Sequence, residues 1–163
     1  MNPLGFVQFP TTADVGIFAY ADSFPSLIDQ TSQGMMNVMN MDLISKQQSI
    51  HHGQWSANFP QHLDNEMILL RWLDEVLFHA SVLNQYYVEG NISIQHKNDG
   101  IIVFCDVIYI QNDTDHTGLE IKAVTSHECF VHNVPSDGSY VHKNSEIPEI
   151  IGPAWVSQVI VDV

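Results

Sequence analysis

Residues 91–110 read NISIQHKNDGIIVFCDVIYI, and this stretch decides the kind of fold that the chain can adopt. Two runs rich in apolar and β-branched residues, 91–97 and 101–110, flank the turn Asn98-Asp99-Gly100. Asp-Gly supplies the positive φ angles of a tight hairpin turn, so the two runs are predicted to pair as antiparallel strands. An antiparallel sheet is therefore expected to form much of the second half of the chain.

Two amphipathic helices are predicted before this hairpin. Apolar residues recur at helical spacing over 25–40, after Ser23 as a candidate cap. The pattern is clearest over 64–85, where Asp64 stands at the capping position. Both segments are long enough for ordinary globular helices.

Further strands are predicted on both sides of these elements. The segment 15–21 alternates between faces, and 43–58 contains an exposed strand. Later strands are expected over 119–132 and 155–163, with a turn at 135–138 between them. Two early helices and a run of late strands predict an α+β fold. We expect a two-layer sandwich with a mostly antiparallel or mixed sheet and two helices, forming one domain over 1–163.

The charge balance limits the function classes that fit the chain. It has 19 acidic residues against 5 lysines and arginines, for a formal net charge of −14. The five basic residues are dispersed: Lys46, Arg71, Lys97, Lys122 and Lys143. Nucleic-acid binders neutralise phosphates with clustered Lys and Arg, so direct RNA or DNA binding is not expected, and neither is an anionic membrane surface. Strong acidity favours a hard-cation site, docking onto a basic protein, or solubility alone.

Several absences predict a cytoplasmic protein. The sequence has no apolar run of the length that crosses a bilayer, and its start, MNPL, does not resemble a signal peptide. The two cysteines, Cys105 and Cys129, are too far apart for a CxxC pair and are expected to be reduced. The nine histidines form no zinc-like set and are expected at the surface or in the core. Alternation predicts that His127 and Cys129 share one strand face and that His132 lies on the other.

Acidic residues stand at two strand ends. Asp14 precedes the first predicted strand, and Asp162 ends the last one beside Val163 and its α-carboxylate. If these strands are neighbours, three anionic oxygen groups meet, which suits Ca²⁺, Mg²⁺ or Mn²⁺ better than zinc. Spacing alone leaves the alternative open, with Asp14 as a turn residue and Asp162 as an exposed strand-end charge.

Four segments occur in an order and spacing that resemble the archease family. They read TADVGI at 12–17, LRWLDEVL at 70–77, GLEIKAVT at 118–125 and DV at 162–163. Similar segments open that family's sequences, form its Leu-rich helix, carry a lysine in a late strand, and end the chain. His116, shortly before the third segment, also resembles a histidine of the family. The resemblance extends from about residue 6 to 163.

This resemblance implies a function and a set of site residues. Archeases assist the GTP- and metal-dependent RNA ligase that joins 2′,3′-cyclic phosphate or 3′-phosphate ends to 5′-hydroxyl ends in tRNA splicing or RNA repair. The helper promotes ligase guanylylation and multiple turnover, and it is not itself an enzyme. The resemblance implies that Asp14, Asp162 and Val163 bind a divalent cation, with calcium expected and magnesium or manganese as alternatives. It also implies that Lys122, Asp74 and Glu75 take part in activating the partner.

Two residues depart from the family pattern, and two other function classes remain open. Pro10 and Thr11 stand where the family has Asp and His, which weakens the expected metal affinity. A chaperone-like acidic binding module would associate with several basic proteins and would not depend on Asp14. A metal-dependent hydrolase would need an open coordination position and turnover without a partner.

Overall fold

The computed structural model describes residues 3–39, 49–112 and 119–163. Its elements, in chain order, are β1 (Gly5–Pro10), β2 (Val15–Ala21), α1 (Phe24–Met39), β3 (Ser49–Phe59), α2 (Asn65–Leu83), β4 (Gln85–Lys97), β5 (Gly100–Gln111), β6 (Ala123–Val134), β7 (Ser139–Tyr140), β8 (Ile150–Ile151) and β9 (Ala154–Asp162). In the described part of the chain, no helix is long and apolar enough to cross a membrane.

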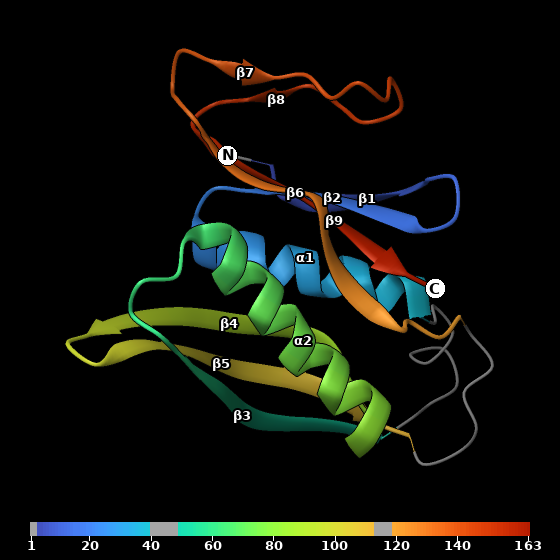
Figure 1. The fold of residues 1–163 in the computed structure, drawn as a ribbon, viewed down its shortest axis with the longest axis vertical. Helices are drawn as coiled ribbons and strands as arrows, with labels where there is room; N and C mark the ends of the chain where they lie inside the picture. The colour runs from blue at the N-terminus through green and yellow to red at the C-terminus, as the bar shows by residue number, and fades with distance from the viewer. Residues whose placement is uncertain (1–2, 40–48, 113–118) are drawn as a thin grey trace.

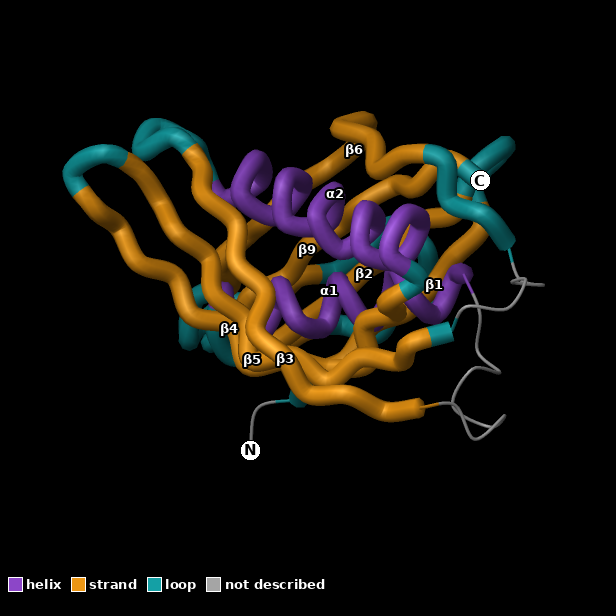
Figure 2. The backbone as a smooth tube through the Cα atoms, turned by 90° about the horizontal axis from the view of Figure 1, so that it is seen from below, coloured by secondary structure: helices purple, strands orange, loops and turns teal. Residues whose placement is uncertain are grey.

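The strands form two main antiparallel sheets. Sheet A has the order β1-β2-β9-β6, and sheet B has the order β3-β5-β4. The two helices lie between the sheets, with α1 packed on β2 and β4 and α2 packed on β6 and β4 (Figures 1 and 2). The short β7–β8 pair stands on the other side of sheet A (Figure 1). The predicted α+β class, with two helices and mostly antiparallel pairing, is confirmed.

The predicted helix caps form. The Ser23 hydroxyl accepts a hydrogen bond from the Ser26 N–H at 3.2 Å, and the Asp64 carboxylate accepts one from the Met67 N–H at 2.9 Å. Side-chain oxygens of this kind satisfy backbone donors that the first helical turn leaves unpaired. Helix α2 ends at Asn84, whose φ of 55° is left-handed, and β4 begins at the next residue.

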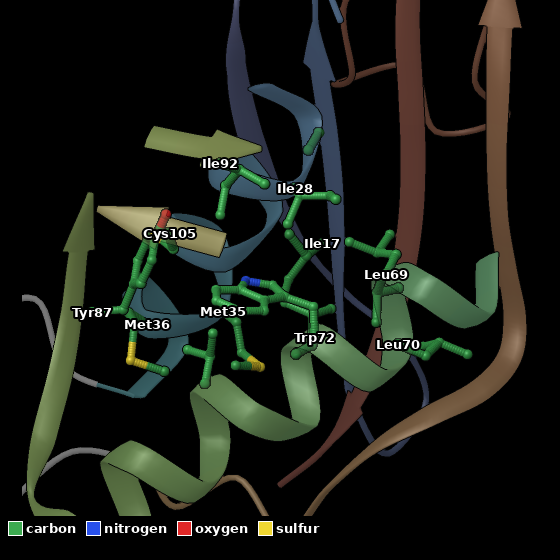
Figure 3. Packing of buried hydrophobic residues seen from close by; sticks show 14 of the residues in the cluster. Ile17, Ile28, Met35, Met36, Leu69, Leu70, Trp72, Tyr87, Ile92 and Cys105 are labelled. Atoms are coloured by element: carbon green, nitrogen blue, oxygen red, sulfur yellow. The ribbon is translucent and has the colours of Figure 1, made fainter. Parts of the chain in front are cut away.

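Trp72 lies at the centre of the core between the helices (Figure 3). Its side chain is fully buried with Ile17, Met35 and Leu69, and Figure 3 shows these side chains around it. The indole Nε1–H donates to the Ser32 hydroxyl at 3.1 Å, which joins α2 to α1. A buried indole N–H needs such a partner, so this bond orients the largest side chain of the core.

Two further polar links tie α1 to both sheets. The Thr31 and Ser157 hydroxyls lie 2.9 Å apart, and this contact joins α1 to β9 of sheet A. The Asp29 carboxylate accepts hydrogen bonds from the Tyr87 hydroxyl at 2.6 Å and from the Gly90 N–H at 2.9 Å, both on β4 of sheet B. Because these bonds are directional, they fix the position of α1 between the two sheets, which burial of its apolar face alone would not do.

A second apolar cluster covers the far face of sheet A. Phe18 and Ile160 from β2 and β9 pack there with Ile147 and Ile150, and Tyr140 stacks on Phe18 with ring centroids 5.6 Å apart. The chain segment around β7 and β8 thus covers a face of sheet A that would otherwise be exposed.

Most element positions agree with the sequence predictions, and the differences have physical reasons. The 98–100 hairpin forms with Lys97 opposite Gly100. Strand β1 was not predicted, because it is short, begins at Gly5, ends at Pro10 and alternates little. Strand β4 begins earlier than the predicted run, directly after α2. Part of the exposed strand predicted within 43–58 corresponds to β3, and 43–48 lie outside the described residues.

Candidate functional site

Three chain segments converge at one end of sheet A. Val15 pairs with Val161, and Asp162 pairs with Ala123 on the opposite edge of β9. Asp14 therefore lies one position beyond the last β2–β9 pair, on the row of Asp162. Figure 1 shows the β1–β2 turn and the C-terminus at this same end of the sheet. Strand pairing thus brings together residues that are almost the whole chain apart in sequence.

The β1–β2 turn holds Asp14 through its backbone. The Thr11 N–H donates to the Asp14 carbonyl at 3.1 Å, and the Asp14 N–H donates to Thr11 Oγ1 at 3.1 Å. The Thr11 hydroxyl is a neutral group, and its role here is to close the turn. Asp14 is left half-buried, with its carboxylate free of any hydrogen bond described in the structure.

Lys122 lies beside this end of the sheet but not within a strand. The expectation that a strand contains Lys122 is corrected, because β6 begins at Ala123. Its backbone N–H donates to the Asp162 carbonyl at 2.8 Å, so the residue is anchored to β9 while its side chain is exposed. Lys122 therefore lies at the same end of the sheet as Asp14 and Asp162, and no ion pair described in the structure joins its ammonium group to either carboxylate.

The carboxylates at this end of sheet A are oxygen donors. Among the described residues, no three His, Cys, Asp or Glu side chains gather closely enough to hold a metal ion. Strand pairing places two carboxylate side chains, those of Asp14 and Asp162, on this row of the sheet. An all-oxygen set of this kind suits Ca²⁺, Mg²⁺ or Mn²⁺, whereas zinc sites are usually built from His and Cys.

Asp74 and Glu75 lie elsewhere, on α2, and they face different surroundings. Partial burial raises the pKa of the Asp74 carboxyl, and the nearby Arg71 charge lowers it by a smaller amount. Glu75 instead lies 3.8 Å from His79 Nε2 on the following turn. No contact described in the structure joins either residue to Asp14, Asp162 or Lys122, so the fold does not assemble the six predicted residues into one site.

A pocket opens beside Asp14 that the sequence did not reveal. It has a volume of about 430 Å³, and Asp14 lies in its wall together with His127, Glu128 and Lys143. Glu128 lies 4.0 Å from Lys143 Nζ and 3.9 Å from His127 Nε2. Lys143 thus places a positive charge near the Glu128 carboxylate at the exposed side of the pocket wall.

A buried hydrogen-bonded chain shapes this pocket. His142 Nδ1 accepts from the Asn144 N–H at 2.9 Å, which places the ring proton on Nε2, 2.6 Å from Gln158 Oε1. The Gln158 amide in turn donates to the Glu128 carbonyl at 3.0 Å. Glu128 has a φ of 53°, a left-handed conformation that costs free energy in a residue other than glycine. The chain of bonds stabilises this bulge in β6.

The bulge also overturns one prediction from alternation. The register of β6 against β9 shifts between Thr125 and Phe130. As a result His127 lines the pocket, whereas Cys129 packs against the main core. The sequence also predicted that histidines lie at the surface or in the core. His142 agrees with this prediction, because it is buried and hydrogen bonded on both ring nitrogens. His116 and Gly118, the first residue of the third motif, lie outside the described residues.

Known proteins share these segments and this fold. The family model described as the archease protein family matches residues 6–163. A protein of Methanothermobacter thermautotrophicus named "Protein archease" is 25% identical over 124 residues, which cover 76% of this chain and 85% of that protein. The solution structure of Methanobacterium thermoautotrophicum protein 1598 matches with a TM-score of 0.64 at 20% identity, over 98% of this chain and 99% of that one.

Proposed function

The chain belongs to the archease family, and on this premise we propose that it is a non-catalytic, metal-binding activator of a GTP-dependent RNA ligase. The partner would join RNA ends that carry a 2′,3′-cyclic phosphate or 3′-phosphate to 5′-hydroxyl ends, in tRNA splicing or RNA repair. The helper would promote guanylylation of the ligase and sustain its multiple turnover.

One observation supports this proposal above the others: Asp14, Asp162 and Lys122 converge at one end of sheet A. Spacing alone left open whether Asp14 and Asp162 meet or are separate turn and strand-end charges. Side chains that share a sheet end can act on one partner group together, and the rigid sheet keeps their separation fixed.

In this proposal Asp14, Asp162 and the carboxylate of Val163 hold a divalent cation, with calcium as the expected ion and magnesium or manganese as alternatives. When bound, the cation would supply positive charge next to the phosphates of the ligase's nucleotide. Thr11 orients the backbone of Asp14, which partly compensates for the Asp and His that the family has at positions 10 and 11.

The remaining charges fit a protein partner. Lys122 is exposed at the same end, where it can reach an anionic group of the ligase. Asp74 and Glu75 on α2 would meet basic residues of the ligase at a separate contact. A chain with a net charge of −14 is suited to a basic protein surface and does not compete for the RNA.

The decisive experiment measures guanylylation of the ligase from the same organism, present in limiting amount, with and without this protein. Asp14→Asn, Asp162→Asn and Lys122→Ala are compared with Asp137→Asn, an exposed aspartate in the turn beyond the other end of β6. We expect the first three to lose most of the acceleration, about tenfold or more, and Asp137→Asn to retain it.

The result separates activation from simple association. If the protein binds the ligase and several other basic proteins without accelerating guanylylation, the acidic binding module is the better description. Equal losses in the three Asp→Asn variants, with Lys122→Ala retaining the acceleration, would assign the effect to net charge instead of to the sheet end.

Metal binding is tested without the ligase. Calcium that binds only the folded chain raises the melting temperature in proportion to ln(1 + [Ca²⁺]/Kd). We expect this rise in the wild type and in Asp137→Asn, and its loss in Asp14→Asn and Asp162→Asn. A calcium-dependent rise that survives both substitutions would contradict the assigned ligands.

A further inference from the structure

Among the residues 3–39, 49–112 and 119–163, the two main sheets have four edge strands, and three of these strands carry features that hinder pairing with another chain. Strand β1 is short and ends at Pro10. Strand β4 has a register shift at Tyr87/Glu89, and α1 packs against it. Strand β6 contains the bulge at Glu128. Short strands, prolines, bulges and charges are the usual protections of an open edge.

Strand β3 has none of these protections. Its eleven residues pair one for one with β5, from Ser49 opposite Gln111 to Phe59 opposite Ile101. It contains no proline and no Asp, Glu, Lys or Arg, in a chain with 24 such charged residues, 19 acidic and 5 basic. Among the described residues, no strand pairs with its outer side. Its outer N–H and C=O groups therefore form a long and regular template for another strand.

We propose that β3 pairs antiparallel with β3 of a second copy of the chain, across a two-fold axis. Three strands from each copy would then form one sheet in the order β4-β5-β3-β3-β5-β4. This assembly uses sheet B and is independent of the ligase role, which rests on the end of sheet A.

The charge pattern selects a second copy over a basic partner. A basic strand would be attracted by carboxylates along the edge, and β3 has none. Two-fold pairing sets each residue of one strand opposite a residue of the same strand in the other copy. Because every residue of β3 is formally uncharged at pH 7 with neutral histidine, any register avoids the like-charge pairs that destabilise antiparallel strands.

The same pattern predicts an unusual salt dependence. Each copy carries a net charge of −14, so two copies repel one another at low ionic strength. The interface itself holds no ion pair that salt would weaken. Added salt should therefore strengthen the dimer, which is the reverse of an association driven by opposite charges.

The test is sedimentation velocity of the full chain over a wide concentration range, at low and high sodium chloride. The variant Gln54→Lys/Ser56→Lys introduces charges into β3, and Asn91→Lys/Ser93→Lys is its control in β4. These residues share rows of sheet B: Gln54 and Asn91 flank Asp106, and Ser56 and Ser93 flank Phe104. All four substituted residues are exposed, and both variants change the net charge equally.

We expect the wild type and the β4 variant to dimerise, more so at high salt, and the β3 variant to have a dimer Kd raised about tenfold or more. Circular dichroism and melting temperature establish that both variants are folded. A wild type that stays monomeric at high concentration and high salt overturns the proposal. So does a dimer that both variants weaken equally, or one that salt dissociates.

Discussion

Sheets A and B differ in how much of each is covered. Sheet A is enclosed: the helices cover one face, and the segment around β7 and β8 covers the other, so Phe18 is fully buried. In the part of the chain that the structure describes, sheet B is covered only by the helices. On its outer face Phe104 of the central strand is 39% exposed, and Asp106 beside it is exposed too.

This difference corresponds to the two roles proposed above. The candidate cation ligands Asp14 and Asp162 lie at the end of the enclosed sheet, where packing on both faces holds the strand ends in place. The half-covered sheet has an exposed face and an open edge, which are features of a contact surface. On these two proposals, the degree of coverage distinguishes the sheet that positions cation ligands from the sheet that meets another chain.

The largest expected effect comes from truncating one aromatic residue on the outer face of each sheet. Phe18→Ala should lower the free energy of unfolding by about 3–5 kcal/mol, because it leaves a cavity under the β7–β8 segment. Phe104→Ala should cost about 1 kcal/mol or less, since solvent already reaches that ring. Urea unfolding followed by circular dichroism measures both. Equal costs would mean that the outer face of sheet B is covered in solution.

A smaller effect is expected from the polar links between α1 and the two sheets. Asp29→Asn removes a charged acceptor of two hydrogen bonds from sheet B and should cost about 2 kcal/mol. Thr31→Val removes a neutral link to sheet A and should cost about 1 kcal/mol. Urea unfolding midpoints at equal m-values provide the comparison. The reverse order would show that α1 is anchored chiefly to the enclosed sheet.

Local sequence signals predicted the elements that local chemistry determines. The capping oxygens of Ser23 and Asp64, the turn at 98–100 and the apolar faces of both helices all depend on neighbours within a few residues. The meeting of β2 with β9 depends instead on pairing across almost the whole chain. Only the resemblance to a family, and not the spacing of Asp14 and Asp162, suggested that their strand ends meet.

What the sequence did not predict lies where tertiary contacts override alternation. The bulge at Glu128 is stabilised by Gln158, thirty residues away, so no local pattern reveals it. The pocket beside Asp14 depends on that bulge and on the loop that carries His142. The protection of the edges also became visible only when the pairing order was known, since β3 alone looks like an ordinary exposed strand.

The smallest expected effect is a difference in thiol reactivity between the single cysteine of sheet A, Cys129, and that of sheet B, Cys105. Burial raises the pKa of the Cys105 thiol in sheet B to about 12. Burial, with the Glu66 and Asp64 carboxylates nearby, raises the pKa of the Cys129 thiol in sheet A to about 11. Both values exceed the ordinary 9.0, so native thiols stay protonated where unfolded ones ionise. The thiols' contribution to stability is thus complete below pH 9 and is lost as the pH rises through 11 and 12.

Thiolate is the reactive form, and Cys129 is half-buried whereas Cys105 is buried. Iodoacetamide at pH 8 should therefore label Cys129 faster than Cys105. The one-unit difference in pKa alone makes the rate about tenfold higher, and the greater exposure of Cys129 increases the ratio further. Mass spectrometry of quenched samples measures the two rates, and Cys129→Ser should leave only the slow one. The enclosed sheet would then hold the more reactive thiol, because Cys129 lies on its edge strand while Cys105 lies on the central strand of sheet B, facing the helices. Faster labelling of Cys105 would show that sheet B opens towards its helices more readily than its buried inner face implies.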